Sequence, residues 1–116
     1  MNEEEDLILN MLQQTQIDKL IGEIVSGYEP EKIYLFGSYA TGKQTSDSDI
    51  DLFIIKNTTK RKIERNREVR KSIKAFPQSG LDIFIFTPLE LQEGLQQTIN
   101  IGKEAVITGK LIYERV

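Results

Sequence analysis

The sequence contains no cysteine and no histidine among its 116 residues. Without them the chain cannot form disulfides, a thiolate nucleophile, a zinc site of the Cys/His type or an imidazole general base. Any chemistry must therefore use carboxylates, hydroxyls, amines or a hard metal ion held by oxygen atoms.

Long apolar runs are also missing, so the sequence predicts no membrane span. The first residues, Met-Asn-Glu-Glu-Glu-Asp, are acidic where a secretory signal would be basic. The apolar fraction of 39% and the charged fraction of 28% are ordinary for a soluble protein. We expect a cytoplasmic protein that forms one domain over residues 1–116.

Positive charge is concentrated in one segment of a chain whose net charge is −3. Nine of the 15 Lys and Arg residues lie in 56–74, opposed there only by Glu64 and Glu68. The charged helix expected at 60–75 has three interpretations: a solvated face covering a sheet, a docking surface for an acidic patch on a partner, or a guide for RNA or polyphosphate. Direct nucleic-acid binding is disfavoured because no aromatic residues alternate with the basic ones for base stacking.

The hydrophobic pattern predicts alternating helices and strands. Two apolar faces near the N-terminus point roughly 140° apart, which predicts a break between a helix at 4–13 and another at 15–26, with Thr15 as its cap. The charged helix is expected to use Ile63, Val69, Ile73 and Phe76 as its apolar face. Strands are expected at 32–36, 49–55, 81–86 and 111–113, and helices from 87 and at 97–108.

The segment Gly37-Ser-Tyr-Ala-Thr-Gly42-Lys43 resembles a phosphate-binding P-loop. A P-loop, however, needs Ser or Thr after its lysine to bind magnesium, and here Gln44 follows. The chain then enters another strand where a P-loop would open a helix. The sequence therefore argues against a P-loop, although Gly37 lets the backbone approach an anion and Ser38 adds a hydroxyl donor.

Carboxylates on two apolar strands are the stronger signal. Asp49 and Asp51 leave the same face of one predicted strand, and two such charges repel unless a cation neutralises them. Asp82 begins a second apolar strand and can join them if the strands are neighbours. Three carboxylates placed so would suit two magnesium ions and an in-line phosphoryl or nucleotidyl displacement.

The pattern Gly37-Ser38-x-Ala40-x-Gly42, then Ser48-Asp49-Ile50-Asp51-Leu52 and a later Asp82, resembles the signature of the DNA polymerase β-like nucleotidyltransferase superfamily. In its size the chain is similar to the minimal nucleotidyltransferases. The resemblance implies an α+β fold: a mixed sheet of about four strands flanked by helices. One departure is Thr41, where many relatives carry a basic residue, with Lys43 as a possible substitute.

The resemblance further implies ATP as substrate and two Mg²⁺ ions as cofactors. Gly37 and Ser38 would hold the β and γ phosphates, and Lys43 would support nucleotide binding. Asp49 and Asp51 would bind both metals, while Asp82 would complete the catalytic metal site and help deprotonate the incoming hydroxyl.

Minimal nucleotidyltransferases resemble the antitoxin half of a toxin–antitoxin pair whose partner is a small helical protein of the HEPN type. The implied reaction is transfer of AMP to a tyrosine hydroxyl of that partner. Two alternatives stay open at this point. One is a non-catalytic module that inhibits its partner by binding, and the other is an enzyme acting on a small-molecule hydroxyl.

Overall fold

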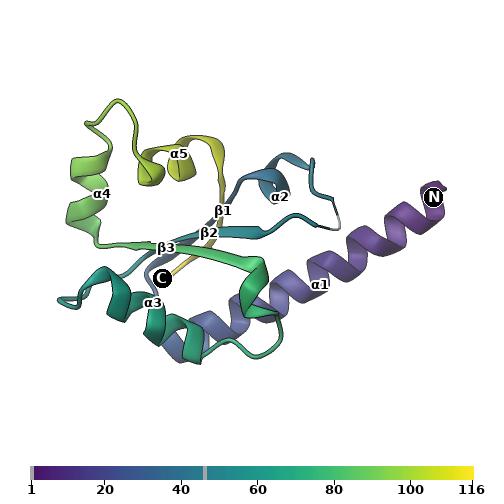
Figure 1. The fold of residues 1–116 in the computed structure, drawn as a ribbon, viewed down its shortest axis with the longest axis horizontal. Coiled ribbons are helices and arrows are strands. Elements are labelled where there is room, and N and C mark those ends of the chain that lie inside the picture. The colour runs from purple at the N-terminus through teal and green to yellow at the C-terminus, as the bar shows by residue number, and fades with distance from the viewer. Residues whose placement is uncertain (1, 46) are drawn as a thin grey trace.

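The computed structural model describes residues 2–45 and 47–116 as a four-stranded sheet with helices on both faces (Figure 1). The elements in chain order are α1 Glu3–Tyr28, β1 Lys32–Phe36, α2 Ser38–Thr41, β2 Ile50–Ile55, α3 Lys62–Lys71, the 3₁₀ turn η1 Gln78–Gly80, β3 Leu81–Phe86, α4 Pro88–Gly94, α5 Ile101–Thr108 and β4 Lys110–Glu114. This arrangement confirms the α+β class and the mixed sheet.

The strands lie in the order β3-β2-β1-β4. The central strand β1 is antiparallel to both β2 and β4, while β2 and β3 are parallel. The parallel pair is joined by α3, because parallel neighbours need a crossover connection. As a result, the two apolar strands that carry the predicted aspartates are neighbours.

Alternation along the strands divides the core into two layers. On one face Ile50, Leu52 and Ile54 of β2 pack with Ile17, Leu20 and Ile24 of α1 and with Val69 and Ile73 of α3. On the other face Phe53 and Ile55 pack with Phe86 and with Ala105 of α5. The face covered by α4 and α5 also carries Asp51, which alternates with Leu52 along β2.

The N-terminal segment forms one helix of 26 residues, so the predicted break at residue 14 is wrong. The side chain of Asn2 caps the helix by accepting a hydrogen bond of 2.9 Å from the Glu5 N–H. The expected cap, Thr15, instead donates its hydroxyl to the Met11 carbonyl inside the helix. The apolar residues of the two halves of α1 point in different directions because only those of the C-terminal half pack on the sheet. The N-terminal half of the helix extends beyond the sheet (Figure 1).

Helix α3 is shorter than the predicted 60–75, and its packing differs from expectation. Ile63 is 62% exposed, whereas Arg65 is 6% exposed and replaces it on the buried face beside Val69. Three polar side chains of α3 reach the outer edge of β3. Arg65, Asn66 and Arg70 donate hydrogen bonds to the carbonyls of Ile85, Ile83 and Leu81, at 3.2, 2.7 and 2.9 Å.

These bonds satisfy edge carbonyls that would otherwise be available to another strand. Helix α3 therefore closes the β3 edge of the sheet as well as covering one of its faces.

Helix α4 begins where the sequence predicts, with a complete capping box between Thr87 and Glu90 and Pro88 in the first turn. Helix α5 is shorter than the predicted 97–108 and is capped by Asn100, whose side chain accepts from the Gly102 N–H at 2.9 Å. Among the described residues, no helix combines the length and apolar character needed to cross a membrane.

Candidate functional site

Asp51 and Asp82 are direct partners in the parallel register of β2 and β3. Register partners in a parallel pair point to the same face, so both carboxylates leave the sheet side by side. The apolar side chains under α4 and α5 belong to the other end of these strands, at Phe53, Ile55 and Phe86. Asp51 is half-buried and Asp82 is exposed, so the pair lies on a part of the sheet that solvent can reach.

The environment of Asp51 disfavours its charged form. Burial raises the pKa of the Asp51 carboxyl to about 6, helped by a hydrogen bond with Asp82 and by the negative charges of Asp82, Asp49 and Glu104. All of these causes act against ionisation of Asp51. A cation placed between the carboxylates would reverse this balance.

Gly37 lies directly against Asp51. It follows Phe36, the cross-strand partner of Asp51 in β1, and adopts φ +74° and ψ −153°, a region that only glycine occupies readily. A Cβ atom on Gly37 would lie 2.2 Å from Oδ2 of Asp51. The glycine is therefore required both for the turn out of β1 and for the space that the carboxylate occupies.

The other two predicted phosphate-binding residues, Ser38 and Lys43, lie on α2 and just after it. Ser38 is the first residue of this short helix and is half-buried, next to Gly37. Lys43 has an exposed side chain, and its backbone N–H donates to the Ser38 carbonyl at 3.0 Å, which closes the loop on itself. The fold thus brings Gly37 and Ser38 to the end of β1 beside the carboxylates.

Asp49 stands just before β2, exposed, and its charge acts on Asp51. Within the described part of the chain, no three carboxylates are gathered closely enough to hold a metal ion. The structure therefore pairs Asp51 with Asp82 and leaves Asp49 at the margin of the pair. The donor set still fits Mg²⁺, because it consists of carboxylate oxygens whose mutual repulsion a hard divalent cation would relieve.

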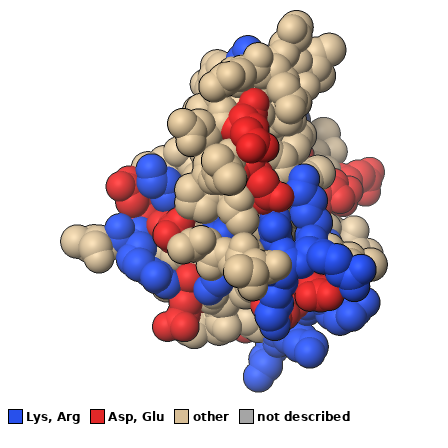
Figure 2. Space-filling view, turned by 90° about the vertical axis from the view of Figure 1, so that its left-hand side faces the viewer, with Lys and Arg blue, Asp and Glu red and all other residues tan. Residues whose placement is uncertain are grey.

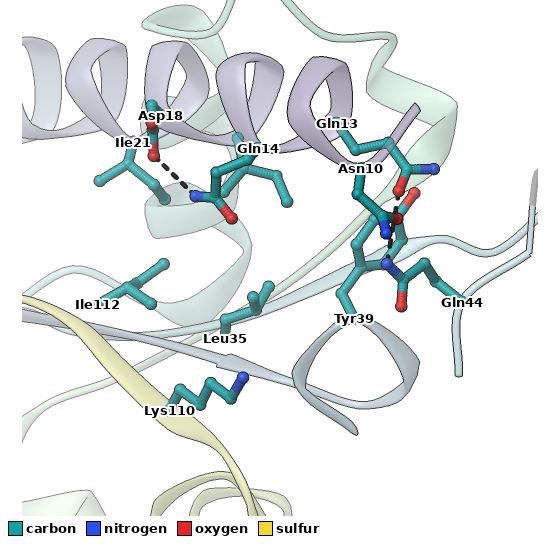
Figure 3. A pocket seen from close by; sticks show the side chains of 11 residues that line it. Asn10, Gln13, Gln14, Asp18, Ile21, Leu35, Tyr39, Gln44, Lys110 and Ile112 are labelled. Atoms are coloured by element: carbon teal, nitrogen blue, oxygen red, sulfur yellow. Dashed lines mark hydrogen bonds between the residues drawn. The ribbon is translucent and has the colours of Figure 1, made fainter. Parts of the chain in front are cut away.

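Two hollows lie along α1, and both are lined by Gln13 and Tyr39. One of about 470 Å³ adjoins Asp49 and is walled by Tyr39, Phe76 and Pro77. The other, of about 320 Å³, lies between α1 and the opposite face of the sheet, lined by amides such as Gln14 and by apolar side chains such as Leu35 (Figure 3). Of these two hollows, the first adjoins the predicted site residue Asp49, and neither is lined by Asp51 or Asp82.

The basic segment is largely occupied by structural contacts. Lys and Arg gather over the lower half of the face shown in Figure 2, where α3 lies. Arg65 donates to Glu90 at 2.6 Å, and Lys56 donates to the Tyr28 carbonyl at 2.6 Å. Lys60 pairs with Glu68, and Arg61 pairs with Glu64. These contacts favour the interpretation of α3 as a covering helix.

Sequence reasoning missed two contributors to this region. Glu104, on α5, raises the pKa of Asp51, and nothing in its local sequence marks it because the contact depends on how α5 crosses the sheet. Arg65 anchors α3 to β3 and α4 from a buried position. The sequence contained an indication of this position, because Arg65 precedes Val69 by four residues and so lies on the same face of the helix.

The chain matches the family model described as "Polymerase beta, Nucleotidyltransferase" over residues 19–116. That match includes both strands with the paired aspartates and the Gly37-Ser38 turn. The chain therefore belongs to the polymerase β type nucleotidyltransferase family.

One curated relative comes from Methanocaldococcus jannaschii and is named as a candidate protein adenylyltransferase. It is 38% identical over 88 residues, which are 72% of this chain and 58% of the relative's own length. The match thus spans little more than half of that protein.

Two solved structures share the fold. A candidate nucleotidyltransferase from Sulfolobus solfataricus superimposes with a TM-score of 0.60 at 22% identity, covering 92% of this chain and 83% of the other. A structure described as a toxin–antitoxin with AMP-PNP gives a TM-score of 0.50 at 23% identity, covering 87% and 73%. At these identities the likeness shows the fold.

Proposed function

We propose that this protein transfers AMP from ATP to a tyrosine hydroxyl of a HEPN-type partner protein and so acts as the antitoxin of a toxin–antitoxin pair. The family membership, the relative named as a candidate protein adenylyltransferase and the toxin–antitoxin structure with AMP-PNP support this assignment. The single observation that carries it is the Asp51–Asp82 pair on an open part of the sheet, with Gly37 against Asp51.

In the proposed reaction, the acceptor oxygen attacks the α-phosphorus of ATP. A new bond forms between that oxygen and the phosphorus, the bond to the bridging oxygen breaks, and pyrophosphate leaves. Asp82 accepts the proton of the hydroxyl, directly or through water. Gly37 and Ser38 orient the β and γ phosphates through their place at the end of β1, with Lys43 available from the same loop.

Asp49, Asp51 and Asp82 are the residues proposed to hold two Mg²⁺ ions. When bound, these ions neutralise charge on the triphosphate and on the leaving pyrophosphate. The raised pKa of Asp51 supports this role, since a carboxylate surrounded by like charges gains most from a cation.

A label-transfer assay tests the proposal. The protein, Mg²⁺ and the product of the neighbouring gene are mixed with ATP labelled at either the α or the γ phosphate. We expect α label to reach the partner, whose mass rises by one AMP, and we expect Asp51→Asn and Asp82→Asn to abolish transfer. Asp47→Asn is the matched control, since it removes a carboxylate two residues before Asp49 and outside the strand.

The remaining outcomes separate the alternatives. Transfer of γ label would indicate phosphoryl transfer and contradict the proposal. Co-purification without transfer of either label, unchanged by Asp51→Asn, would indicate a non-catalytic binding module. Transfer of α label to a small-molecule hydroxyl but not to the protein partner would leave the reaction class standing and overturn the acceptor.

A further inference from the structure

The outer face of α1 carries an apolar surface that the fold does not use. Leu7, Ile8, Met11 and Leu12 are 61, 58, 62 and 58% exposed. At about 100° per residue, these side chains face away from Ile17, Leu20 and Ile24 of the core. They belong to the half of the helix that extends beyond the sheet (Figure 1). We refer to residues 3–12, with this apolar face, as the α1 arm.

The arm exposes roughly 450 Å² of apolar side-chain surface, the size of the largest apolar patch on a typical monomer, which is often functional. Two arms, together with the surfaces that they would cover on a partner, exceed the minimum of about 1,000–1,200 Å² for a specific protein interface. The arm is thus large enough to support association with one partner.

The second half of the same outer face has the complementary shape. Its exposed positions include the small residues Gly22 and Ser26, and a groove of about 670 Å³ runs between them and the end of α3. A Cβ on Gly22 would meet nothing within 4 Å, so the space above it is open. Large side chains in the first half of α1 therefore match a hollow in the second half.

The charges of the two halves are complementary as well. The first turn of α1 contains Glu3, Glu4, Glu5 and Asp6. The groove is bordered by three exposed lysines, Lys19, Lys71 and Lys74, and by one carboxylate, Glu23, which accepts from the backbone N–H groups of Lys74 and Ala75. Its charge is therefore positive on balance. Because Gly27 packs closely on Ser72, the end of α3 lies beside the end of α1 and brings two of these lysines to it.

We propose that a second copy of this chain occupies the groove, with the two α1 helices antiparallel about a two-fold axis. In this arrangement Met11 of one copy lies opposite Gly22 of the other, and Leu7 lies opposite Ser26. The acidic first turn of each copy then faces Lys71 and Lys74 of its neighbour. The interface is isologous, since each copy supplies one arm and one groove.

The dimer leaves the aspartates accessible. Helix α1 packs on the face of the sheet formed by Ile50, Leu52 and Ile54, whereas Asp51 points to the other face. Association through the outer side of α1 thus occurs away from the carboxylate pair. The inference does not depend on the reaction that the pair performs.

Light scattering coupled to size exclusion, at chain concentrations from about 1 to about 200 µM, tests the dimer. We expect a dimer for the wild type and a monomer for Met11→Lys with Leu12→Lys. Ile107→Lys is the control, because Ile107 is 66% exposed on α5, away from the arm. A wild-type monomer over the whole range, or a dimer that survives the double substitution, would overturn the proposal.

A charge exchange tests the antiparallel geometry. Glu3→Lys, Glu4→Lys and Glu5→Lys together reverse the charge of the arm and leave the groove basic, while Lys71→Glu with Lys74→Glu gives an acidic arm and an acidic groove. Each variant alone should dimerise at least tenfold more weakly, and an equimolar mixture should form a heterodimer in which both contacts are attractive. No gain on mixing would contradict the proposed register.

Discussion

Gly37 and Asp51 are packed so closely that any side chain on the glycine would displace the aspartate. The position of a Cβ on Gly37 falls 2.2 Å from Oδ2 of Asp51 and 3.2 Å from its Cγ. Gly37 directly follows the last residue of β1, Phe36, which is the cross-strand partner of Asp51 on the antiparallel strand β2. The turn that begins the phosphate-binding segment and the orientation of the central carboxylate are therefore linked.

Gly37→Ala should abolish nucleotidyl transfer and lower stability, because it adds both a steric clash and backbone strain of about 1–3 kcal/mol. Gly42→Ala separates the two effects. Gly42 also has φ +74°, but a Cβ there would meet nothing within 4 Å. We expect Gly42→Ala to lower the melting temperature, because of the backbone strain alone, while it retains most transfer activity. Equal losses of activity in both variants would contradict a specific role for the Gly37–Asp51 contact.

Asp51→Asn should stabilise the metal-free protein at pH 7.5, because it removes a charge that burial and three neighbouring acidic groups disfavour. The same substitution should remove most of the stabilisation given by millimolar Mg²⁺. Differential scanning fluorimetry with and without Mg²⁺ measures both effects, and Glu93→Gln is a control for a change of net charge on an exposed part of α4. A fall in the metal-free melting temperature of Asp51→Asn alone would count against the prediction.

The Arg65–Glu90 pair predicts a component of acid unfolding. Burial by itself would raise the pKa of Glu90, but hydrogen bonds from Arg65 and Thr87 outweigh it and hold the pKa below its usual 4.5. Since the folded state then binds the proton less readily than the unfolded state, the contribution of Glu90 is complete above pH 4.5 and is lost as the pH falls through the folded pKa. Urea titrations of wild type and Glu90→Gln between pH 3 and pH 7 measure it.

We expect Glu90→Gln to be less stable at pH 7 by about 1–2 kcal/mol, below the loss for a fully buried pair because Glu90 is partly exposed. The difference from wild type should shrink as the pH falls below 4.5. A difference that stays constant with pH would show that the ionised form of Glu90 is not responsible.

Arg70 is predicted to protect the sheet edge. Arg70→Ala removes the donor to the Leu81 carbonyl and two hydrogen bonds to Gln78, which should cost about 1–3 kcal/mol and leave the β3 edge open to another strand. Arg67→Ala removes an exposed arginine from the same helix and should change stability by less than about 0.5 kcal/mol. Chemical denaturation measures the stability of the two variants, and light scattering on heating measures their aggregation. Equal stability and equal aggregation would show that Arg70 does not protect the β3 edge.

The strands were the most predictable part of the fold. The ranges 32–36 and 81–86 agree with β1 and β3, because both are short apolar runs with turn residues on each side. The prediction that Asp51 and Asp82 lie close together depended on the assumption that their strands are adjacent. The register of β2 and β3 confirms that assumption.

Helix boundaries and faces were less predictable. Periodicity detects which residues share a face but not whether that face meets the sheet or solvent, so the outward-facing Leu7 and Met11 suggested a break that the helix does not have. Polarity alone predicts that Ile63 is buried and Arg65 is exposed, and the structure shows the reverse. Arg65 can be buried because carbonyls and a carboxylate surround its guanidinium. Two of these partners, the Ile85 carbonyl and the Glu90 carboxylate, lie 20 and 25 residues further along the sequence.

The two faces of the sheet are covered by helices to different extents, and their residues are therefore under different constraints. Residues between α1, α3 and the sheet are constrained by shape, so most substitutions there change how much folded protein a cell contains. The opposite face carries Asp51, whose charged form is disfavoured by burial and by acidic neighbours, so stability does not explain its presence and function does. Alternate positions of the short strand β2 therefore have different roles. Ile50, Leu52 and Ile54 stabilise the fold, whereas Asp51, which lies between them, is there for the function of the site.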